Sequence, residues 1–188
     1  MHLQPGHCYY IYNRGNNRER IFFTRENYLF FLQKIRRHLL PHMRLLAWCL
    51  MPNHFHLLVQ VREETSMPAC GAAFRVLLSS YTRAIQKQEQ RTGSLFQQQT
   101  KAKDMLAGDG HYGLTCFCYI HQNPVRAQLI AETARWPWSS YPDYLGLRPG
   151  TLCDQETARA LLDLPDTAEE LRLLTLAIMP QEKVDSLF

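Results

Sequence analysis

The sequence predicts an α+β fold, a ferredoxin-like βαββαβ unit whose antiparallel sheet is covered by two helices on one face. Short segments with aromatic-rich or alternating patterns indicate four strands, near residues 7–14, 43–50, 54–61 and 95–103. Longer segments with apolar residues at helical spacing indicate the two helices, near residues 25–40 and 71–90. The other face of the sheet is left open for a site.

The boundaries and alternation of the central elements support this order. Pro41 ends the first helix, and the Met51-Pro52-Asn53 turn joins the second and third strands. Along the third strand, polar and apolar residues alternate, so the face bearing His54 and His56 is separable from the core face.

A further helix is expected from Asp109 to Asn123. Its apolar residues fit one buried stripe at Leu114, Phe117, Cys118 and Ile120. The helix should end at Asn123 because Pro124 disfavours a helical conformation in the residue before it. This helix would lie beside the open face of the sheet.

The rest of the chain reads as a connector and a helical tail. Prolines interrupt any regular pattern between residues 132 and 151, and short helices should follow near 154–163 and 167–178. We therefore divide the chain into a domain at residues 1–130 and a C-terminal connector and tail at residues 131–188, packed on or near it.

Composition restricts the class of protein. The 188 residues are enough for one domain with a core, and 46% hydrophobic with 20% charged residues is typical of a soluble globular chain. Because neither a membrane-spanning stretch nor a secretory leader is visible, we expect a cytoplasmic, nucleoid-associated protein whose six cysteines are reduced and largely buried. The net charge of +4 permits a nucleic-acid partner without requiring one.

The most informative motif is the histidine pair at the head of the third strand. Side chains two residues apart on a strand project to the same face, so His54 and His56 can hold one cation while Phe55 points into the core. Two surface histidines on an edge strand would give the same pattern. A second motif is therefore needed to favour the metal site.

The second motif is Tyr119 followed by Asn123. On a helix these residues sit one turn apart on one face, so a phenol and an amide oxygen would point the same way. Tyr9 is also followed by an asparagine four residues on, but in a predicted strand that would splay the two side chains. Tyr119 is therefore the best-placed candidate nucleophile.

Together the motifs resemble a known family. They run in order through Arg14-Gly15-Asn16-Asn17-Arg18, Met51-Pro52-Asn53-His54-Phe55-His56-Leu57-Leu58-Val59, Gly93-Ser94-Leu95-Phe96-Gln97, Tyr119-Ile120-His121-Gln122-Asn123-Pro124-Val125-Arg126-Ala127 and Trp136-Pro137-Trp138-Ser139-Ser140-Tyr141. This combination resembles the single-tyrosine HUH transposases (IS200-like), and within them the branch associated with repetitive extragenic palindromes (REP). The resemblance covers residues 7 to 145.

The resemblance implies a role for each site residue. His54 and His56 would be paired metal ligands, Tyr119 the nucleophile and Asn123 the third protein ligand. Mixed nitrogen and oxygen ligation suits Mg²⁺ or Mn²⁺. The chain departs from many relatives at Gln128, where they have glycine, and at Gln97-Gln98-Gln99, where they often have Gln-Gly-Arg.

The implied activity is cutting and joining of single-stranded DNA at REP-like hairpins through a covalent 5′-phosphotyrosine, by a monomer or homodimer. Two alternatives remain at the level of the sequence. One is a hairpin-binding protein without catalysis, and the other is a metal-dependent phosphodiester hydrolase in which Tyr119 is structural. Of the three activities, only cutting and joining through Tyr119 leaves protein covalently joined to the cut strand.

Candidate DNA contacts are the basic and amide residues near these motifs. The turn after the first strand can bring side chains and backbone N–H groups to phosphates, and basic residues alternate on the last strand. The full set of candidates is Arg14, Asn16, Asn17, Arg18, Lys101, Lys103 and Arg126. Ordinary solvated surface is the alternative explanation for each.

Overall fold

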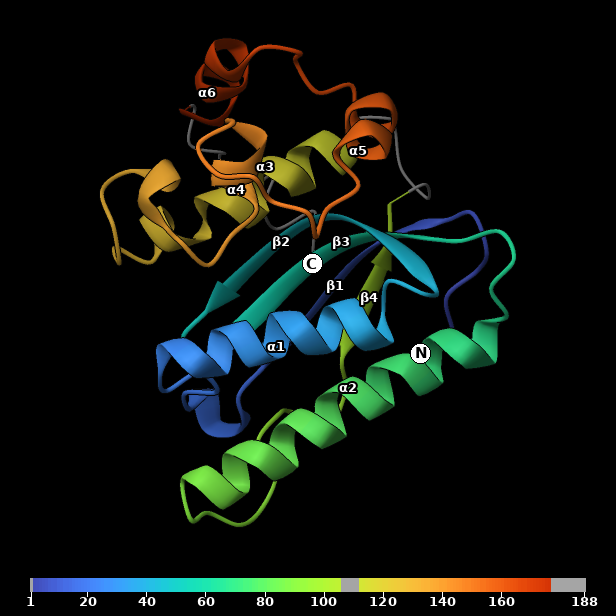
Figure 1. Cartoon of the computed structure of the whole chain (residues 1–188), viewed down its shortest axis with the longest axis vertical. Coiled ribbons are helices and arrows are strands. Elements are labelled where there is room, and N and C mark those ends of the chain that lie inside the picture. Colours follow the sequence, from blue (N-terminus) through green and yellow to red (C-terminus); the bar gives the residue numbers. More distant parts are fainter. Residues whose placement is uncertain (1, 106–111, 177–188) are drawn as a thin grey trace.

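The computed structural model describes residues 2–105 and 112–176, in which a four-stranded sheet separates two groups of helices (Figure 1). The strands are β1 (Cys8–Arg14), β2 (Met43–Met51), β3 (His54–Val61) and β4 (Lys101–Asp104). The α-helices are α1 (Arg25–His38), α2 (Met67–Gln88), α3 (Tyr112–Arg126), α4 (Tyr141–Tyr144), α5 (Gln155–Leu162) and α6 (Ala168–Leu176). Short 3₁₀ turns η1 and η2 occupy Asn16–Arg18 and Thr133–Arg135.

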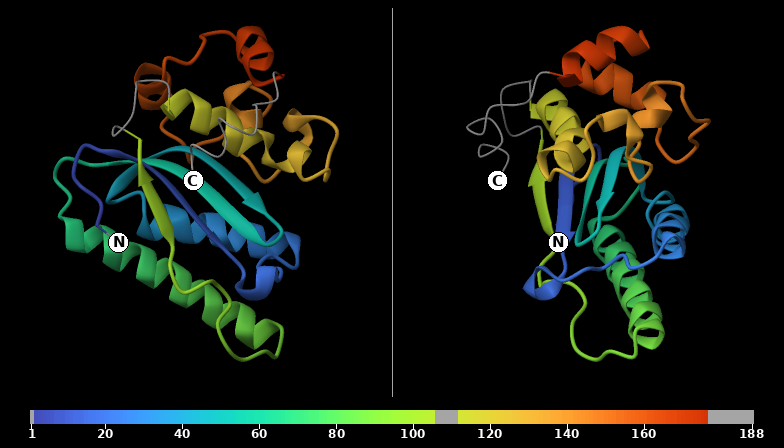
Figure 2. Two further views of the ribbon diagram at one scale, coloured as in Figure 1. Left: turned by 180° about the vertical axis from the view of Figure 1, so that it is seen from behind. Right: turned by 90° about the vertical axis from the view of Figure 1, so that its left-hand side faces the viewer.

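The sheet confirms the predicted topology. Its strand order is β2-β3-β1-β4 and every neighbouring pair is antiparallel. This order follows from two crossover connections through α1 and α2, which lie on one face of the sheet. Figures 1 and 2 show α1 and α2 together on that side and the helices from α3 onward gathered on the other.

Strand alternation divides the interior into two cores. On the α1 and α2 side, Phe55 and Leu57 of β3 pack with Phe31 and Tyr81, all nearly free of solvent exposure. On the α3 side, Tyr10, Leu58 and Cys49 pack with α3 residues such as Phe117. Burial on both faces fixes the register of β3, because a slip by one residue would exchange the two sets of side chains.

The C-terminal segment docks on the edge strand β2. Leu50 N–H donates to the carbonyl of Trp138 at 2.8 Å, and Ser140 N–H donates to that of Trp48 at 2.9 Å. This pairing covers backbone groups that an edge strand otherwise leaves exposed. The helices α5 and α6 then contact α3 on its far side.

The strand predicted at 95–103 is shorter than expected. Only Lys101–Asp104 joins the sheet, and Phe96 forms a single isolated bridge with Gly15. The side chain of Asn13 donates to the carbonyl of Gln97 at 3.3 Å and to Thr100 Oγ1 at 2.9 Å. Backbone bonds join the start of this stretch to the end of β1, from Asn16 N–H to the Leu95 carbonyl and from Gln97 N–H to the Arg14 carbonyl, both at 2.9 Å. Toward Thr100 the Asn13 side-chain bonds take the place of a regular backbone ladder, so the strand is not extended.

The prediction that α3 ends at Asn123 is wrong. The helix continues to Arg126 with Pro124 inside it, and Ala127 N–H closes the next turn on the carbonyl of Asn123 at 2.9 Å. A proline removes the hydrogen bond from its own nitrogen and crowds the carbonyl four residues earlier, but near a helix end the following turn can still form. The expected start at residues 109–111 lies outside the described residues.

Two further observations concern the cysteines and the membrane. All six cysteines are free thiols, and only Cys153 is partly exposed. Within the described ranges, the helices are too short or too polar to span a bilayer.

Candidate functional site

The histidine pair lies on the sheet face that α3 partly covers. The ring centroids of His54 and His56 are 4.8 Å apart, with the ring planes nearly perpendicular. In the neighbouring strand β1, Arg14 lies opposite His54 and Tyr12 opposite His56. The two imidazoles therefore share one face, as their spacing predicted, beside a basic and an aromatic side chain.

The helix α3 brings Tyr119 and Asn123 to this pair. The Tyr119 ring meets the His56 ring edge to face, with centroids 5.8 Å apart. The Asn123 amide Nδ2 donates to the Tyr119 carbonyl at 2.8 Å. These four side chains line one cavity of about 270 Å³. Its full lining is Tyr12, Arg14, Met51, His54, His56, Tyr119, Asn123, Arg126 and Ala127.

His56 is held deep in this site. The Tyr10 hydroxyl lies 2.6 Å from its Nδ1, whereas its buried Nε2 has no hydrogen-bond partner in the described part of the chain. Burial, followed by the nearby His54 and Arg14 charges, lowers the pKa of His56 well below its usual range. The ring is therefore neutral near pH 7, with one nitrogen available to a ligand.

His54 has a similar environment with a different partner. Its Nδ1 lies 2.6 Å from the amide oxygen of Asn53. Burial and the Arg14 guanidinium lower the pKa of His54 to about 4, and a hydrogen bond with Asn123 acts in the opposite direction. Both imidazoles are therefore in the form that binds metal ions.

Tyr119 is 9% exposed, enough to leave its edge at the cavity. Burial raises its pKa, while the hydrogen bond from Asn123 and the charges of Arg126 and Arg14 lower it. The Arg126 guanidinium lies 5.9 Å from the centre of the Tyr119 ring. The phenol is thus neutral near pH 7, and Asn123, Arg126 and Arg14 offset part of the cost that burial places on its anion.

The donor atoms fit a divalent cation with open coordination positions. Two imidazoles and an amide oxygen converge on the cavity, and the unpartnered Nε2 of His56 is the kind of buried polar atom that a cation would satisfy. In the described ranges, no group of three or more His, Cys, Asp or Glu side chains forms another metal cluster. His54, His56 and Asn123 are therefore the candidate ligands.

The candidate DNA-binding residues divide into two groups. Arg14 and Arg126 line the cavity itself. Lys101 lies opposite Tyr12 and Lys103 opposite Tyr10 in the antiparallel pairing of β1 with β4, so both lysines share the sheet face of the histidines. The turn residues Asn16, Asn17 and Arg18 form η1 at the end of β1, with Asn17 and Arg18 at positive φ.

Sequence reasoning missed the partners of the two histidines. Tyr10 and Asn53 contact the Nδ1 atoms, and neither was expected in the site. The alternation of Tyr10 and Tyr12 placed them on one face of β1, but the register that sets this face beside β3 is not visible in a single sequence. The position of Asn53 directly before His54 was the available signal.

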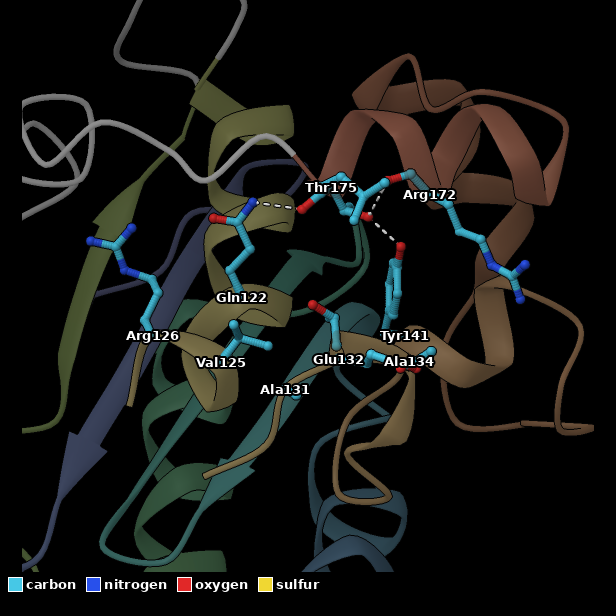
Figure 3. A pocket seen from close by; sticks show the side chains of 11 residues that line it. Gln122, Val125, Arg126, Ala131, Glu132, Ala134, Tyr141, Arg172 and Thr175 are labelled. Atoms are coloured by element: carbon cyan, nitrogen blue, oxygen red, sulfur yellow. Dashed lines mark hydrogen bonds between the residues drawn. The ribbon is translucent and has the colours of Figure 1, made fainter. Parts of the chain in front are cut away.

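A second cavity of about 530 Å³ lies on the other side of α3, against η2 and α6 (Figure 3). Gln122 Nε2 donates to the Thr175 carbonyl at 2.9 Å, and the Tyr141 hydroxyl bonds to Thr175 Oγ1. Figure 3 shows Arg126 extending away from these groups. Arg126 lines both this cavity and the cavity of the tyrosine and the histidines, which otherwise have different lining residues among those described.

The comparisons with known proteins bear on the fold. No family model matches this chain, and no curated protein matches it. A solved structure of a REP-associated tyrosine transposase bound to a REP hairpin is similar, with a TM-score of 0.58 and 18% sequence identity over 82% of this chain and 91% of that one. The chain has the fold of that transposase. The predicted fold class is thereby confirmed.

Proposed function

We propose that this chain is a single-tyrosine HUH transposase, a metal-dependent enzyme that cuts and joins single-stranded DNA beside a hairpin through a covalent intermediate on Tyr119. One observation carries the proposal. His54 and His56 on a strand and Tyr119 and Asn123 on a helix, far apart in the sequence, line one small cavity. Ordinary surface histidines would have no reason to share a cavity with a tyrosine and an amide from a distant helix.

A hairpin of the REP type is the proposed partner. The similar solved structure is of a transposase bound to a REP hairpin, and its fold is shared over most of both chains. The basic side chains Arg14, Lys101, Lys103 and Arg126 share the face of the site in this chain. Because a tyrosine on α3 must reach a single phosphate, an unpaired strand next to a hairpin is a better substrate than continuous duplex.

The chain's own residues perform most of the reaction. The Tyr119 oxygen attacks the phosphorus and forms a new O–P bond, while the bond from phosphorus to the 3′ oxygen breaks. The phenol proton is released, and the departing 3′ oxygen takes up a proton. The product is a 5′-phosphotyrosine beside a free 3′-OH, and attack by a 3′-OH reverses the step, so joining needs no ATP.

Groups around Tyr119 support its proposed role as nucleophile by offsetting part of the cost of ionising a buried phenol. A neutral phenol is a poor nucleophile, but Arg126 and Asn123 stabilise the anion that develops on Tyr119. His54, His56 and Asn123 would hold Mg²⁺ or Mn²⁺, which when bound neutralises charge on a non-bridging phosphate oxygen. Arg14 lies beside the pair and adds a positive charge for the phosphate.

The experiment is covalent capture on a denaturing gel. The full chain is incubated with Mn²⁺ and a labelled single-stranded oligonucleotide that carries a REP-like hairpin. We expect a protein–DNA adduct at the 5′ end of the fragment downstream of the cut, which Tyr119→Phe abolishes with hairpin affinity nearly unchanged because only a hydroxyl is lost. Tyr112→Phe, seven residues earlier on α3, is the matched control and should form the adduct normally.

Each other result selects an alternative. Cutting without an adduct would assign the site to a metal-dependent hydrolase, and hairpin binding without cutting would assign it to a binding protein. An adduct formed by Tyr119→Phe would place the nucleophile on another tyrosine.

A further inference from the structure

Both site histidines are held through the same ring nitrogen. The Nδ1 of His54 lies 2.6 Å from Asn53 Oδ1, and the Nδ1 of His56 lies 2.6 Å from the Tyr10 hydroxyl. In each ring this leaves Nε2 as the remaining nitrogen, and that of His56 is buried without a hydrogen-bond partner in the described residues. The two contacts at Nδ1 therefore leave Nε2 of each ring as the nitrogen that can bind a cation.

The proton on His54 can be located from the bonds of Asn53. The Asn53 Nδ2 donates to the Arg18 carbonyl at 3.0 Å. A carbonyl only accepts hydrogen bonds, so the amide NH₂ must face it and the amide oxygen must face His54. Because that oxygen also only accepts, Nδ1 of His54 carries the hydrogen. The neutral ring has one N–H, so Nε2 keeps its lone pair.

The turn that carries Asn53 is itself held by the η1 segment. Gly15 N–H donates to the Asn53 carbonyl at 2.7 Å, and Ile21 N–H donates to that of Pro52 at 2.9 Å. A Cβ at Gly15 would lie 2.0 Å from the Glu19 carbonyl oxygen, so no other residue fits this approach without a shift of the backbone. The Arg14-Gly15-Asn16-Asn17-Arg18 motif thus has a structural role next to the site.

Tyr10 holds the second ring in a comparable way. It is completely buried, its ring is nearly parallel to that of His56, and the centroids are 5.8 Å apart. Its hydroxyl can accept a hydrogen bond from an Nδ1–H as well as donate to a bare nitrogen. The contact fixes the plane of the His56 ring. It also permits His56 to carry its hydrogen on Nδ1, the same tautomer that Asn53 imposes on His54.

We propose that Asn53 is a positioning residue that presets His54, with Tyr10 orienting His56, so that both rings offer Nε2 to a divalent cation. The proposal rests on the proposed function and specifies how the ligands are prepared. Metal-binding histidines generally donate their other N–H to a fixed acceptor, which sets the tautomer before the ion arrives. Here the acceptor is an amide on the turn immediately before the ligand strand.

The first measurement reads the tautomer directly, without metal or DNA. In ¹⁵N-labelled full-length protein at neutral pH, long-range ¹H–¹⁵N NMR distinguishes Nδ1–H from Nε2–H. We expect the Nδ1–H form for His54 in the wild type. Asn53→Ala removes the acceptor and should shift His54 toward the Nε2–H form. Asn53→Asp retains an acceptor and should keep Nδ1–H although the bond to Arg18 is lost.

The second measurement is a Mn²⁺ titration of the same proteins by calorimetry. Loss of such an outer partner typically weakens metal binding by roughly 10- to 100-fold, which we expect for Asn53→Ala. Gln60→Ala is the matched control, because it removes an amide from the same face of β3 whose bonds go to Gly6 and Arg44 rather than to a histidine. Its Mn²⁺ affinity should equal that of the wild type.

The outcomes separate this proposal from the proposed function. An Nε2–H tautomer of His54 in the wild type overturns it, as does unchanged Mn²⁺ affinity in Asn53→Ala. If Asn53→Ala fails to fold, the spectra of the wild type and of Asn53→Asp still test whether His54 carries its hydrogen on Nδ1. Absence of a DNA adduct in the wild type, together with the expected tautomer and Mn²⁺ binding, would instead refute the transposase reaction and leave the positioning role intact.

Discussion

Asn123 presents its oxygen to the histidine pair because its nitrogen is already engaged. The Nδ2 donates to the Tyr119 carbonyl at 2.8 Å, and a carbonyl can only accept. The remaining amide atom is the oxygen, which is the donor atom that Mg²⁺ and Mn²⁺ accept. The same bond links the candidate ligand to the backbone of the candidate nucleophile, so both are positioned by one turn of α3.

The ligand roles predict a graded loss of metal binding. We expect His56→Ala to weaken Mn²⁺ binding more than Asn123→Ala, because an imidazole nitrogen is a stronger ligand than an amide oxygen. Each substitution should weaken Mn²⁺ affinity by at least the roughly 10- to 100-fold that is typical when a residue hydrogen-bonded to a metal ligand is lost. Calorimetric titration measures this, and adduct formation should require proportionately more Mn²⁺.

Two controls bear on that prediction. Both variants should remain folded, because the two side chains line a cavity, although His56→Ala also removes the 2.6 Å contact of the buried Tyr10 hydroxyl and should be the less stable of the two. DNA cleavage in excess chelator would contradict the metal role altogether. Global unfolding of either variant would show that its side chain is structural.

At the scale of elements, the features that depend on local periodicity could be predicted from the sequence. The features that depend on contacts with distant residues could not. The alternation in β3 identified its two faces correctly, since each face packs against a different core. The length of β4 could not be predicted, because the Asn13 side chain takes the hydrogen bonds of a ladder. The end of α3 was set too early, since local proline statistics do not include the turn closed by Ala127.

The site shows the same division. The spacing of His54 and His56 correctly predicted that they share one face, and one helical turn correctly placed Tyr119 beside Asn123; their roles stay a prediction. Asn53 and Tyr10 were missed because their contacts depend on a turn's conformation and on strand register. Arg18 was expected only as a DNA contact, yet its carbonyl holds Asn53.

Ser140 is the residue that ties α3 to β2 and the connector. Its buried Oγ accepts from Trp48 N–H at 3.0 Å and lies 2.8 Å from His121 Nε2. Ser140→Ala leaves both buried partners without this contact, and we expect it to lower the free energy of unfolding by about 1–3 kcal/mol. Denaturant titration with an unchanged m-value measures the loss.

Ser139→Ala is the matched control for Ser140. Ser139 is equally buried, but its Oγ makes one longer bond, to the Trp136 carbonyl at 3.3 Å. We expect Ser139→Ala to lower the free energy of unfolding less than Ser140→Ala does. Equal losses at both serines would mean that the linkage between α3 and the sheet contributes nothing beyond removal of a hydroxyl.

At the scale of the whole molecule, the fold separates stability from chemistry. The face of the sheet under α1 and α2 holds a largely apolar core, while the opposite face is shared between α3 and the candidate site. Positive side chains lie around that second face at Arg14, Lys101, Lys103 and Arg126. These four side chains place positive charge beside the site, where it favours a phosphate backbone.

This distribution predicts the salt dependence of hairpin binding. If Arg14 and Arg18 each neutralise one phosphate, replacing either by alanine should flatten the slope of log K against log salt by roughly 0.7 to 0.9. An arginine that reads a base would instead cost roughly 1 to 3 kcal/mol on the preferred sequence and relax discrimination there. Titration of matched and scrambled hairpins at several salt concentrations distinguishes the two roles.

Arg37→Ala provides the control for this last prediction, because it removes the same charge from the exposed end of α1, on the opposite side of the sheet. The net charge then falls equally in all three variants, and only position differs. We expect the slope for Arg37→Ala to match the wild type. If Arg14→Ala and Arg18→Ala also left slope and affinity unchanged, the turn after β1 would serve only to hold Asn53 and the strand beside it.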